Sequence, residues 1–413
     1  MGLLPGALTP TLQGRLSRLG SRLSFAVAAD ELEQLKGVRV AAATARRRTK
    51  EDGARYAALQ DAATIRLLAQ APPPPAGPAV QQVSVDGTMV HLTDGSWREV
   101  RLLAIGTVGP GRRPEQVQSR QVSYFARLTD AASFTALAAG EVHRRGVETA
   151  GVVAGVVDGA PWCQTFLDTH RPDAVRILDL PHAAQRLTEV AEAVWGDGPP
   201  AIAWAAIQRR ELRDGAAATV LGVIHELPVA TARDPTTATQ VQAETLGYLT
   251  PRLEQMRYAE FRAQGLPIGS GMVESGNKLV VDGRLGGAGR RWAEANVTPM
   301  VALRSAVCSE RWHEAWTAIA RARRQRRPPP APTPVVASAA SVAAPLHRPP
   351  PIPGSAGYDP SRPCPQNFDA HPLRSLTDSF PPAIMRFSIN FGVSAAGCAA
   401  NGGRNDVGAA CDP

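Results

Sequence analysis

A run of prolines divides this sequence into two parts that follow different patterns. Residues 71–78 read Ala-Pro-Pro-Pro-Pro-Ala-Gly-Pro, a composition that favours an extended and fairly stiff chain. Apolar residues recur at helical spacing before this run and at strand spacing after it. We therefore expect a helical segment at residues 1–65, a linker at residues 66–79 and a sheet-containing domain that begins at residue 80.

The first segment has the outline of a helix-turn-helix unit. Its leucines fall on one helical face, and Gly37 precedes a second helix that starts near residue 41. That helix carries basic side chains that we expect to contact DNA, namely Arg46, Arg47, Arg48 and Lys50. A helix, a glycine turn and an arginine-bearing helix indicate a DNA-binding unit. A plain helical hairpin with a solvated basic face fits the same pattern equally well.

The first strand after the linker carries an acidic residue within an apolar run. Residues 83–90 read Val-Ser-Val-Asp-Gly-Thr-Met-Val, and their β-branched residues and near-alternation predict a β-strand. An unpaired charge buried in a strand is costly, so Asp86 either ends the strand at a turn or holds a cation. An Asp-Gly turn is the commoner arrangement between apolar runs, and this stretch alone leaves both open.

The order of the following elements predicts an α/β fold. An uninterrupted apolar run at residues 152–157 is typical of a strand that is covered on both faces. Three strands in succession, followed by alternating helices and strands, indicate a mixed sheet flanked by helices, as in the ribonuclease-H-like fold. The further expected strands are residues 97–108, 121–128 and 174–178, and the expected helices are residues 131–145, 162–170 and 182–195.

Two later segments depart from this order. Residues 196–266 read as mostly helical, so we expect a helical insertion between core residues 80–195 and core residues 267–326. From residue 327 to 413 the composition shifts to proline, alanine and serine with few aromatic residues. This composition predicts a disordered, low-complexity tail.

The composition argues against several classes of protein and favours one kind of partner. No apolar run reaches the roughly 18 residues that a membrane helix needs. The five cysteines form no Cys-x-x-Cys pair, which argues against a zinc site and a disulfide framework and suits a reducing cytosol. The net charge of +8, with arginine as the main cation, indicates a polyanionic partner, nucleic acid first. GC-rich coding would also enrich arginine.

Three acidic residues occur where a sheet could bring them together. Asp86 interrupts the first strand, Asp158 follows the apolar strand at residues 152–157, and Glu274 follows a Gly-Ser-Gly loop. Phosphodiester cleavage by two metal ions needs Mg²⁺ or Mn²⁺ roughly 3.5–4 Å apart, held by oxygen ligands. These carboxylates would supply such ligands, and no Ser-His-Asp arrangement or Walker loop in the sequence competes with them.

Four motifs carry a resemblance to a known family. They read Val-Asp-Gly-Thr at residues 85–88, Val-Val-Asp-Gly-Ala-Pro-Trp at residues 156–162, Ile-Leu-Asp-Leu-Pro-His-Ala at residues 177–183 and Gly-Leu-Pro-Ile-Gly-Ser-Gly-Met-Val-Glu-Ser-Gly-Asn-Lys at residues 265–278. With these motifs the chain resembles the DDE transposases of bacterial insertion sequences, specifically the ISKra group, over about residues 10–320.

The resemblance implies a site and its partners. It implies that Asp86, Asp158 and Glu274 are the catalytic, metal-binding triad, with two Mg²⁺ or Mn²⁺ ions as cofactors. It also implies DNA as substrate, in the form of element ends and target, and a homo-oligomer on that DNA. The Asp179-x-x-His182 pair looks like a signature of several transposase superfamilies, in which His182 would orient water, a metal ligand or a scissile phosphate; Asp179 fits a helix cap equally well.

Further residues of the matching region are candidates for DNA contact. Their types suit phosphate contacts or stacking on an unpaired base, and they are Lys278, Arg284, Arg290, Arg291 and Trp162. An exposed Glu–Lys pair and a core tryptophan are the plain alternatives for Lys278 and Trp162. Two other functions stay open for the chain as a whole. One is a ribonuclease-H-like nuclease that cuts without joining, and the other is a DNA-binding remnant without activity.

Overall fold

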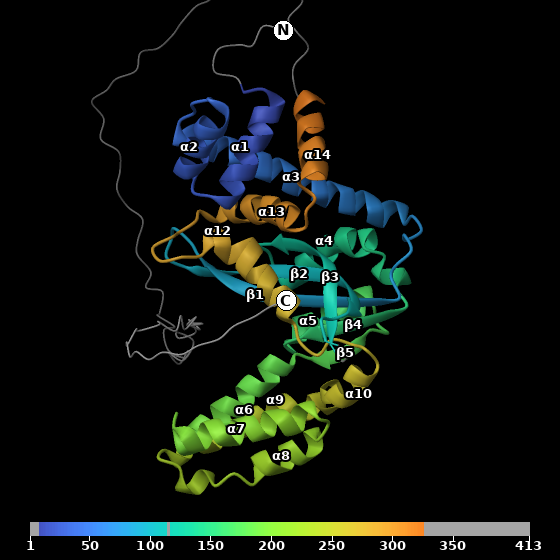
Figure 1. Ribbon diagram of the computed structural model, residues 1–413, viewed down its shortest axis with the longest axis vertical. Coiled ribbons are helices and arrows are strands. Elements are labelled where there is room, and N and C mark those ends of the chain that lie inside the picture. Colours follow the sequence, from blue (N-terminus) through green and yellow to red (C-terminus); the bar gives the residue numbers. More distant parts are fainter. Residues whose placement is uncertain (1–7, 114–115, 326–413) are drawn as a thin grey trace, which may run out of the picture. The chain divides into compact units, whose positions relative to one another are not determined.

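The computed structural model describes residues 8–113 and 116–325 (Figure 1). The predicted low-complexity tail at residues 327–413 lies outside the described residues. No helix in the described part of the chain is both long and apolar enough to cross a membrane.

A five-stranded mixed sheet forms the centre of the fold. Its order is β3-β2-β1-β4-β5. The first three strands are antiparallel, whereas β4 runs parallel to β1 and β5 parallel to β4. The predicted mixed sheet flanked by helices is therefore confirmed. Its strands are β1 (Val80–His91), β2 (Trp97–Pro110), β3 (Val117–Arg127), β4 (Val152–Val157) and β5 (Val175–Leu178).

The Asp-Gly pair at residues 86–87 is not a turn. Asp86 pairs with Leu102 and Gly87 with Arg101, so β1 continues through both positions. The β1–β2 hairpin turns at a second Asp-Gly pair, where Gly95 has a φ of 88°. Glycine adopts this left-handed conformation without steric cost. The turn interpretation of Asp86 is therefore wrong, because this residue lies well inside strand β1.

Each face of the sheet has its own helical cover. Odd-numbered β1 residues such as Val83 and Val85 pack with Phe134 and Phe166 on the first face. The opposite face packs through Leu102 and Tyr124 against later helices. Successive side chains of a strand point to opposite faces, so Gln82, Ser84 and Asp86 point to the second face. The first face is covered by α4 (Ala131–Arg144) and α5 (Pro161–His170), and the second by α11 (Gly271–Gly276), the π-helical turn η4 (Asn277–Asp282), α12 (Gly283–Leu285) and α13 (Val297–Cys308).

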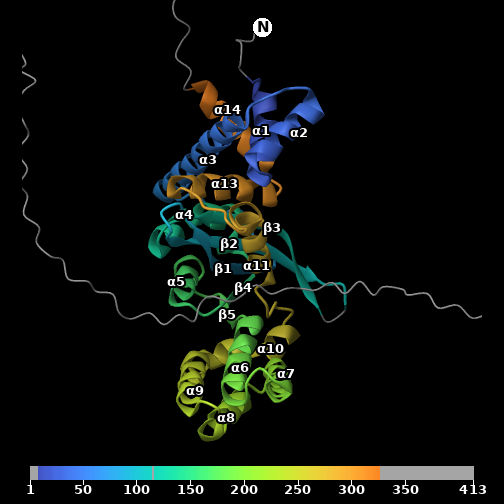
Figure 2. The same cartoon turned by 90° about the vertical axis from the view of Figure 1, so that its left-hand side faces the viewer.

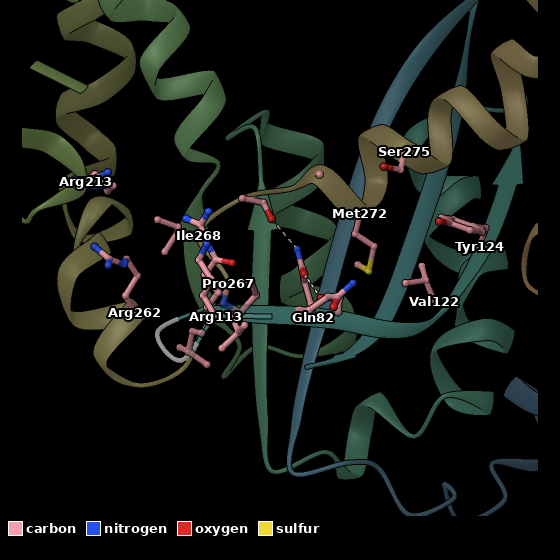
Figure 3. Close-up of a pocket in the computed structure, with 17 residues that line it drawn as sticks. Gln82, Arg113, Val122, Tyr124, Arg213, Arg262, Pro267, Ile268, Met272 and Ser275 are labelled. Atoms are coloured by element: carbon pink, nitrogen blue, oxygen red, sulfur yellow. Dashed lines mark hydrogen bonds between the residues drawn. The ribbon is translucent and has the colours of Figure 1, made fainter. Parts of the chain in front are cut away.

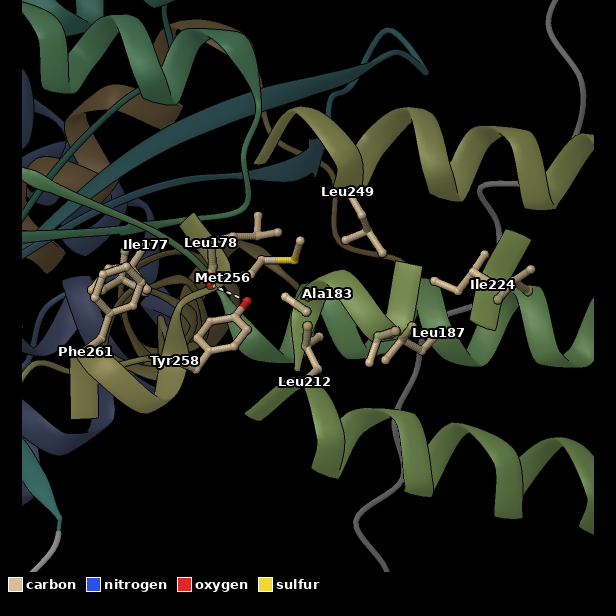
Figure 4. Packing of buried hydrophobic residues seen from close by; sticks show 14 of the residues in the cluster. Ile177, Leu178, Ala183, Leu187, Leu212, Ile224, Leu249, Met256, Tyr258 and Phe261 are labelled. Atoms are coloured by element: carbon tan, nitrogen blue, oxygen red, sulfur yellow. Dashed lines mark hydrogen bonds between the residues drawn. The ribbon is translucent and has the colours of Figure 1, made fainter. Parts of the chain in front are cut away.

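The helical insertion shares a hydrophobic core with the sheet (Figure 4). Ile177 and Leu178 of β5 lie in one cluster with Leu187, Leu249 and Tyr258. The hydroxyl of Tyr258 also donates a hydrogen bond to the carbonyl oxygen of Leu178 at 2.9 Å. The insertion is therefore fixed to the edge of the sheet at β5. The insertion packs on α6 (Leu180–Trp195) of the core, and its helices are α7 (Pro199–Arg213), α8 (Ala217–His225), α9 (Pro235–Leu249) and α10 (Tyr258–Ala263), with the 3-10 turns η2 (Val229–Thr231) and η3 (Thr250–Met256).

The N-terminal helices pack on the C-terminal ones (Figure 2). Gly37, with a φ of 63°, ends α2 as expected. The long helix α3 runs beyond the expected boundary at residue 65 and stops at Gln70, because the proline run begins only at Pro72 and disfavours helix in the residue before it. The helices involved are α1 (Pro10–Arg22), α2 (Phe25–Lys36), α3 (Ala42–Gln70), α13 and α14 (Trp312–Gln325).

Candidate active site between strands β1, β4 and helix α11

Asp86 connects β1 to the helix that carries Glu274. Its Oδ1 accepts a hydrogen bond from the backbone N–H of Gly87 at 2.7 Å, and its Oδ2 accepts one from Asn277 Nδ2 at 2.7 Å. Asn277 follows Glu274 by three residues, so this bond holds the Glu274 helix against the strand. Burial raises the pKa of Asp86 to about 6, and the nearby charge of Asp158 acts in the same direction.

Asp158 lies at the end of β4, the parallel neighbour of β1. Its Oδ1 accepts hydrogen bonds from the backbone N–H of Ala160 at 2.9 Å and from Cys163 Sγ at 3.4 Å. The hydroxyl of Tyr248, from helix α9, donates to the backbone carbonyl of Asp158. The insertion therefore supports the loop that positions this aspartate.

Asp179 caps helix α6 and holds two other parts of the site. It is fully buried. Its Oδ2 accepts hydrogen bonds from the backbone N–H of His182 at 3.0 Å and from His182 Nδ1 at 2.6 Å. Its Oδ1 accepts a bond from the backbone N–H of Ser270, at the start of the Glu274 helix. The capping interpretation is confirmed, and the same carboxylate also orients His182.

His182 is a cation among carboxylates. The hydrogen bond to Asp179 raises the pKa of His182 to about 9 despite partial burial, and the charges of Asp158 and Asp86 act in the same direction. Its imidazole is therefore doubly protonated at neutral pH. Its side chain remains 36% exposed, so one side of the ring can still contact a ligand.

A compact acidic group includes Glu274. Ligand atoms of Asp179, His182 and Glu274 all lie within 4.8 Å of one another, so this group could hold a metal ion. Asp86 and Asp158 are not part of this tight group, although they interact electrostatically with each other and with His182. The structure thus brings the predicted carboxylates to one region. The residues grouped tightly with Glu274 are Asp179 and His182, whereas the sequence indicated Asp86 and Asp158.

A small cavity opens beside Asp158 and His182. Its volume is about 260 Å³, and its lining includes Arg186 and Tyr248. The guanidinium of Arg186 lies 4.9 Å from the centre of the Tyr248 ring. The cavity lining therefore contains a positively charged side chain, Arg186, as well as the carboxylate of Asp158. Arg186 was not among the predicted site residues, and only its position one turn after His182 could have suggested it.

The predicted arginine cluster after the Glu274 helix is split. Arg284 is buried, and its Nε donates to the carbonyl oxygen of Gly20 at 3.1 Å. Its guanidinium stacks on Phe25 at 4.4 Å and on Trp292 at 4.9 Å from the ring centres. Burial lowers the pKa of Arg284 to about 10. The predicted DNA contact of Arg284 is wrong for this structure, because its guanidinium joins protein segments inside the fold.

The other predicted contact residues lie closer to the surface. Arg290, Arg291 and Lys278 are all exposed. Arg290 Nη1 donates to the carbonyl oxygen of Gly286 at 3.0 Å. Trp162 is half-buried and packs edge-on against Phe134 with ring centres 6.0 Å apart. That contact agrees with the core alternative for Trp162.

The basic residues of α3 are partly neutralised. Arg47 lies 3.4 Å and Arg48 3.6 Å from carboxylate oxygens of Glu51. Arg46 is exposed and Lys50 half-buried, and burial lowers the pKa of Lys50.

A second basic surface, which the sequence interpretation missed, lies on α1. Its exposed arginines follow a helical spacing of three and four residues, and they are Arg15, Arg18 and Arg22.

No model of a protein family matches the sequence, and no curated protein matches it either.

Proposed function

We propose that this protein is a metal-dependent enzyme of the ribonuclease-H-like fold that cleaves phosphodiester bonds, and more specifically an insertion-sequence transposase. The strand order supports the fold, because three antiparallel strands are followed by two strands that extend the sheet in parallel from β1. The observation that carries the proposal is the position of Asp86. It lies in the middle of β1, interacts with Asp158 on the parallel neighbour, and is bonded to Asn277 on the segment that carries Glu274.

The chemistry of this region fits a divalent cation. Its carboxylates are Asp86, Asp158, Asp179 and Glu274, and His182 is the cation among them. The Oδ1 atom of Asn277 is buried and has no hydrogen-bond partner among the described residues, although its Nδ2 already binds Asp86. Hard oxygen donors whose carboxylates outnumber the one nearby cation suit Mg²⁺ or Mn²⁺. When bound, such ions would activate the attacking hydroxyl and stabilise charge on the phosphate oxygens.

Asp86, Asp158 and Glu274 are the residues that would hold the ions. Asp179 is less suitable as a ligand, because its two oxygens already accept three hydrogen bonds in a fully buried position. A protonated His182 is a hydrogen-bond donor and not a ligand. We therefore assign Asp179 to positioning and His182 to contact with the anionic phosphate.

The assignment to transposition rests on the resemblance of the four motifs. In that reaction water attacks the phosphodiester at an element end, and the freed 3′-hydroxyl attacks target DNA. The rival functions are cutting without joining and binding without cutting. A strand-transfer assay with a pre-cleaved element end separates joining from cutting, since a nuclease would give no joined product.

Replacing the strand carboxylate tests the catalytic assignment. We expect Asp86→Asn to abolish cleavage of DNA substrate in Mg²⁺, because a neutral amide cannot hold the cation. Binding of the same DNA, measured by fluorescence anisotropy, should be retained. Asp197→Asn is the matched control, because Asp197 is exposed and lies just beyond the end of α6. Cleavage by Asp86→Asn at the wild-type rate would contradict the proposal.

A further inference from the structure

The end of the β1–β2 hairpin, residues 89–97, carries large apolar side chains that are open to solvent. Met89 is 52% exposed and Trp97 is 51% exposed, and neither belongs to a hydrophobic cluster of the described chain. The hairpin end is separate from the largest cavity in the described residues, which lies beside α11 and is lined in part by Gln82 and Met272 (Figure 3). Exposed apolar side chains that gather in one place indicate a contact surface.

The ring of Trp97 is oriented by a histidine on the neighbouring strand. His91 and Trp97 are direct cross-strand partners, and their rings are stacked with centres 4.7 Å apart and an interplanar angle of 5°. Such a pair fixes the orientation of both side chains. Among the described residues, Trp97 has no other ring contact. His91 therefore covers one face of the indole, and the other face is open to solvent.

A third segment places an arginine beside this pair of rings. Trp292 pairs with Leu92 in a parallel bridge, and its backbone N–H donates to the carbonyl oxygen of His91 at 3.0 Å. Figure 1 shows the hairpin end next to the loop that follows α12. Leu92 and Trp292 both pack in the cluster on the second face of the sheet. Because successive side chains point to opposite faces, Arg291 lies on the same face as His91 and Trp97.

The charge of this arginine is available to a ligand. Arg291 is exposed, and its guanidinium forms neither a hydrogen bond nor an ion pair with another described residue. The two acidic side chains of the hairpin are already engaged. Asp94 accepts hydrogen bonds from the N–H of Ser96 at 2.9 Å and from its Oγ at 2.7 Å, and Glu99 pairs with Arg101 at 2.5 Å. A guanidinium beside an open aromatic ring suits the phosphate and the base of one nucleotide.

From this arrangement we infer that the hairpin end binds an unpaired nucleotide of a DNA strand. The base stacks on the open face of Trp97, and the phosphate contacts Arg291. Met89 lies on the same face of β1, two residues from His91, and adds apolar contact to the base. In a duplex both faces of a base are covered by its neighbours, whereas single-strand binding combines cationic side chains with aromatic stacking. The inference rests on the proposed function, since it takes DNA as the ligand.

Binding without cleavage tests the inference. The probe is a fluorescein-labelled oligothymidylate of about ten nucleotides, and its anisotropy is measured with the full chain in EDTA over a series of salt concentrations. Trp97→Leu keeps an apolar side chain but removes the ring, and Arg291→Gln removes the charge. Trp195→Leu is the matched control, because Trp195 is also exposed and next to another ring, that of Trp204, but lies at the end of α6.

Each variant has a distinct expected result. Trp97→Leu should weaken binding about tenfold with an unchanged salt slope, because it removes one stacked base. Arg291→Gln should reduce the salt slope by about 0.7, the contribution of one phosphate on a single strand. Unlabelled oligothymidylate should quench tryptophan fluorescence more in the wild type than in Trp97→Leu, because a stacked base quenches the indole beneath it. The control should bind as the wild type does.

Several outcomes would overturn the inference. They are wild-type affinity of Trp97→Leu, an equal loss in Trp195→Leu, an unchanged salt slope of Arg291→Gln, or an equal loss of affinity of Trp97→Leu for a duplex of the same length. A role of Trp97 in the hairpin alone would lower the stability of Trp97→Leu in urea and leave its affinity unchanged. Failure of the proposed function would appear separately, as uncut substrate with the wild-type protein in Mg²⁺.

Discussion

At the scale of single residues, the candidate site contains a buried carboxylate whose negative charge lowers the stability of the fold. Asp86 is placed where burial and the charge of Asp158 both oppose its ionisation, and the pKa of Asp86 rises from 3.8 to about 6. Each unit of pKa shift corresponds to about 1.4 kcal/mol. The ionised carboxylate therefore destabilises the metal-free fold by about 3 kcal/mol, an arrangement that is typical of residues selected for chemistry.

The sign of this effect gives a prediction for unfolding. Below pH 3.8 Asp86 is protonated in both the folded and the unfolded state, and it causes no loss of stability. Stability falls as the pH rises from about 4 to about 6, because the unfolded state releases its proton first. We expect Asp86→Asn in EDTA to unfold at higher urea concentration than the wild type at pH 8.

Two further results bear on this prediction. The advantage of Asp86→Asn should shrink towards zero near pH 4. The Asn277 amide can turn so that its unpartnered Oδ1 accepts from the new amide, so the substitution need not leave a donor unpaired. If Asp86→Asn is less stable than the wild type at pH 8, the ionised Asp86 carboxylate does not destabilise the fold.

At the scale of elements, the site depends on how closely α11 approaches the sheet. A Cβ atom added at Gly276 would lie 2.7 Å from Tyr124 Cε1 and 2.9 Å from Leu102 Cδ2. Real Cβ atoms do not come this close to other carbon atoms, so only glycine fits between helix and sheet. The next residue, Asn277, then reaches Asp86.

Widening this contact should lower both stability and activity. We expect Gly276→Ala to destabilise the fold by about 1–3 kcal/mol and to abolish cleavage, because the helix and its Glu274 must move away from β1. Urea unfolding and a cleavage assay measure the two effects. Gly222→Ala in α8 is the control, since a Cβ there would meet no atom within 4 Å. It should be neutral or stabilising, because alanine favours helix.

The exposed face of α1 is a second element with a testable role. Among the residues that the structure describes, Arg15, Arg18 and Arg22 form no ion pair with an acidic side chain, in contrast to Arg47 and Arg48 of α3. If the protein binds duplex DNA, we expect replacement of the three α1 arginines by glutamine to lower the salt slope by up to about 2.7, at about 0.9 per phosphate. Titration of a labelled duplex at several salt concentrations measures this slope.

The comparison with α3 decides between the two surfaces. The same replacement at Arg46, Arg47 and Arg48 should reduce the slope less, because Glu51 already neutralises part of their charge. A larger loss in the α3 variant would favour the helix-turn-helix interpretation that the sequence suggested.

At the scale of the whole molecule, buried polar groups join the two ends of the described chain. Asp52 of α3 is fully buried. It accepts hydrogen bonds from Gln13 Nε2 at 2.9 Å, Ser17 Oγ at 2.7 Å and Arg323 Nε at 2.8 Å. One carboxylate thus holds α1, α3 and α14 together, and Arg284 adds a contact to the end of α1.

Removing this carboxylate should loosen both ends together. We expect Asp52→Ala to cost about 1–3 kcal/mol, because it leaves the buried Gln13 Nε2 and Ser17 Oγ donors without their acceptor, whereas Arg323 keeps a carboxylate oxygen of Glu51 at 3.6 Å. Asp52→Asn should cost less, since the amide still accepts one hydrogen bond. Hydrogen exchange should show faster exchange in α1 and α14 and little change in β1 or β4. Uniform loss of protection through the sheet would contradict this local role.

The sequence by itself determined the order and type of the elements and the location of the carboxylates on them. Apolar periodicity and strand composition are local properties, so β4, α5 and α6 were predicted within two residues of their observed bounds. Asp158 followed from the end of an apolar strand in the same way. The Asp-Gly ambiguity at Asp86 could not be resolved locally, because strand pairing with Leu102 decides it.

Only the tertiary structure decided which charged side chains are exposed and which are joined. Arg284 and Gly20 are 264 residues apart in sequence, yet their hydrogen bond converts an expected DNA contact into an internal one. Asp179 likewise joins α6 to a loop 91 residues away. The physical reason is that burial of a polar group is stable only when distant segments supply its partners, and no local pattern records those partners.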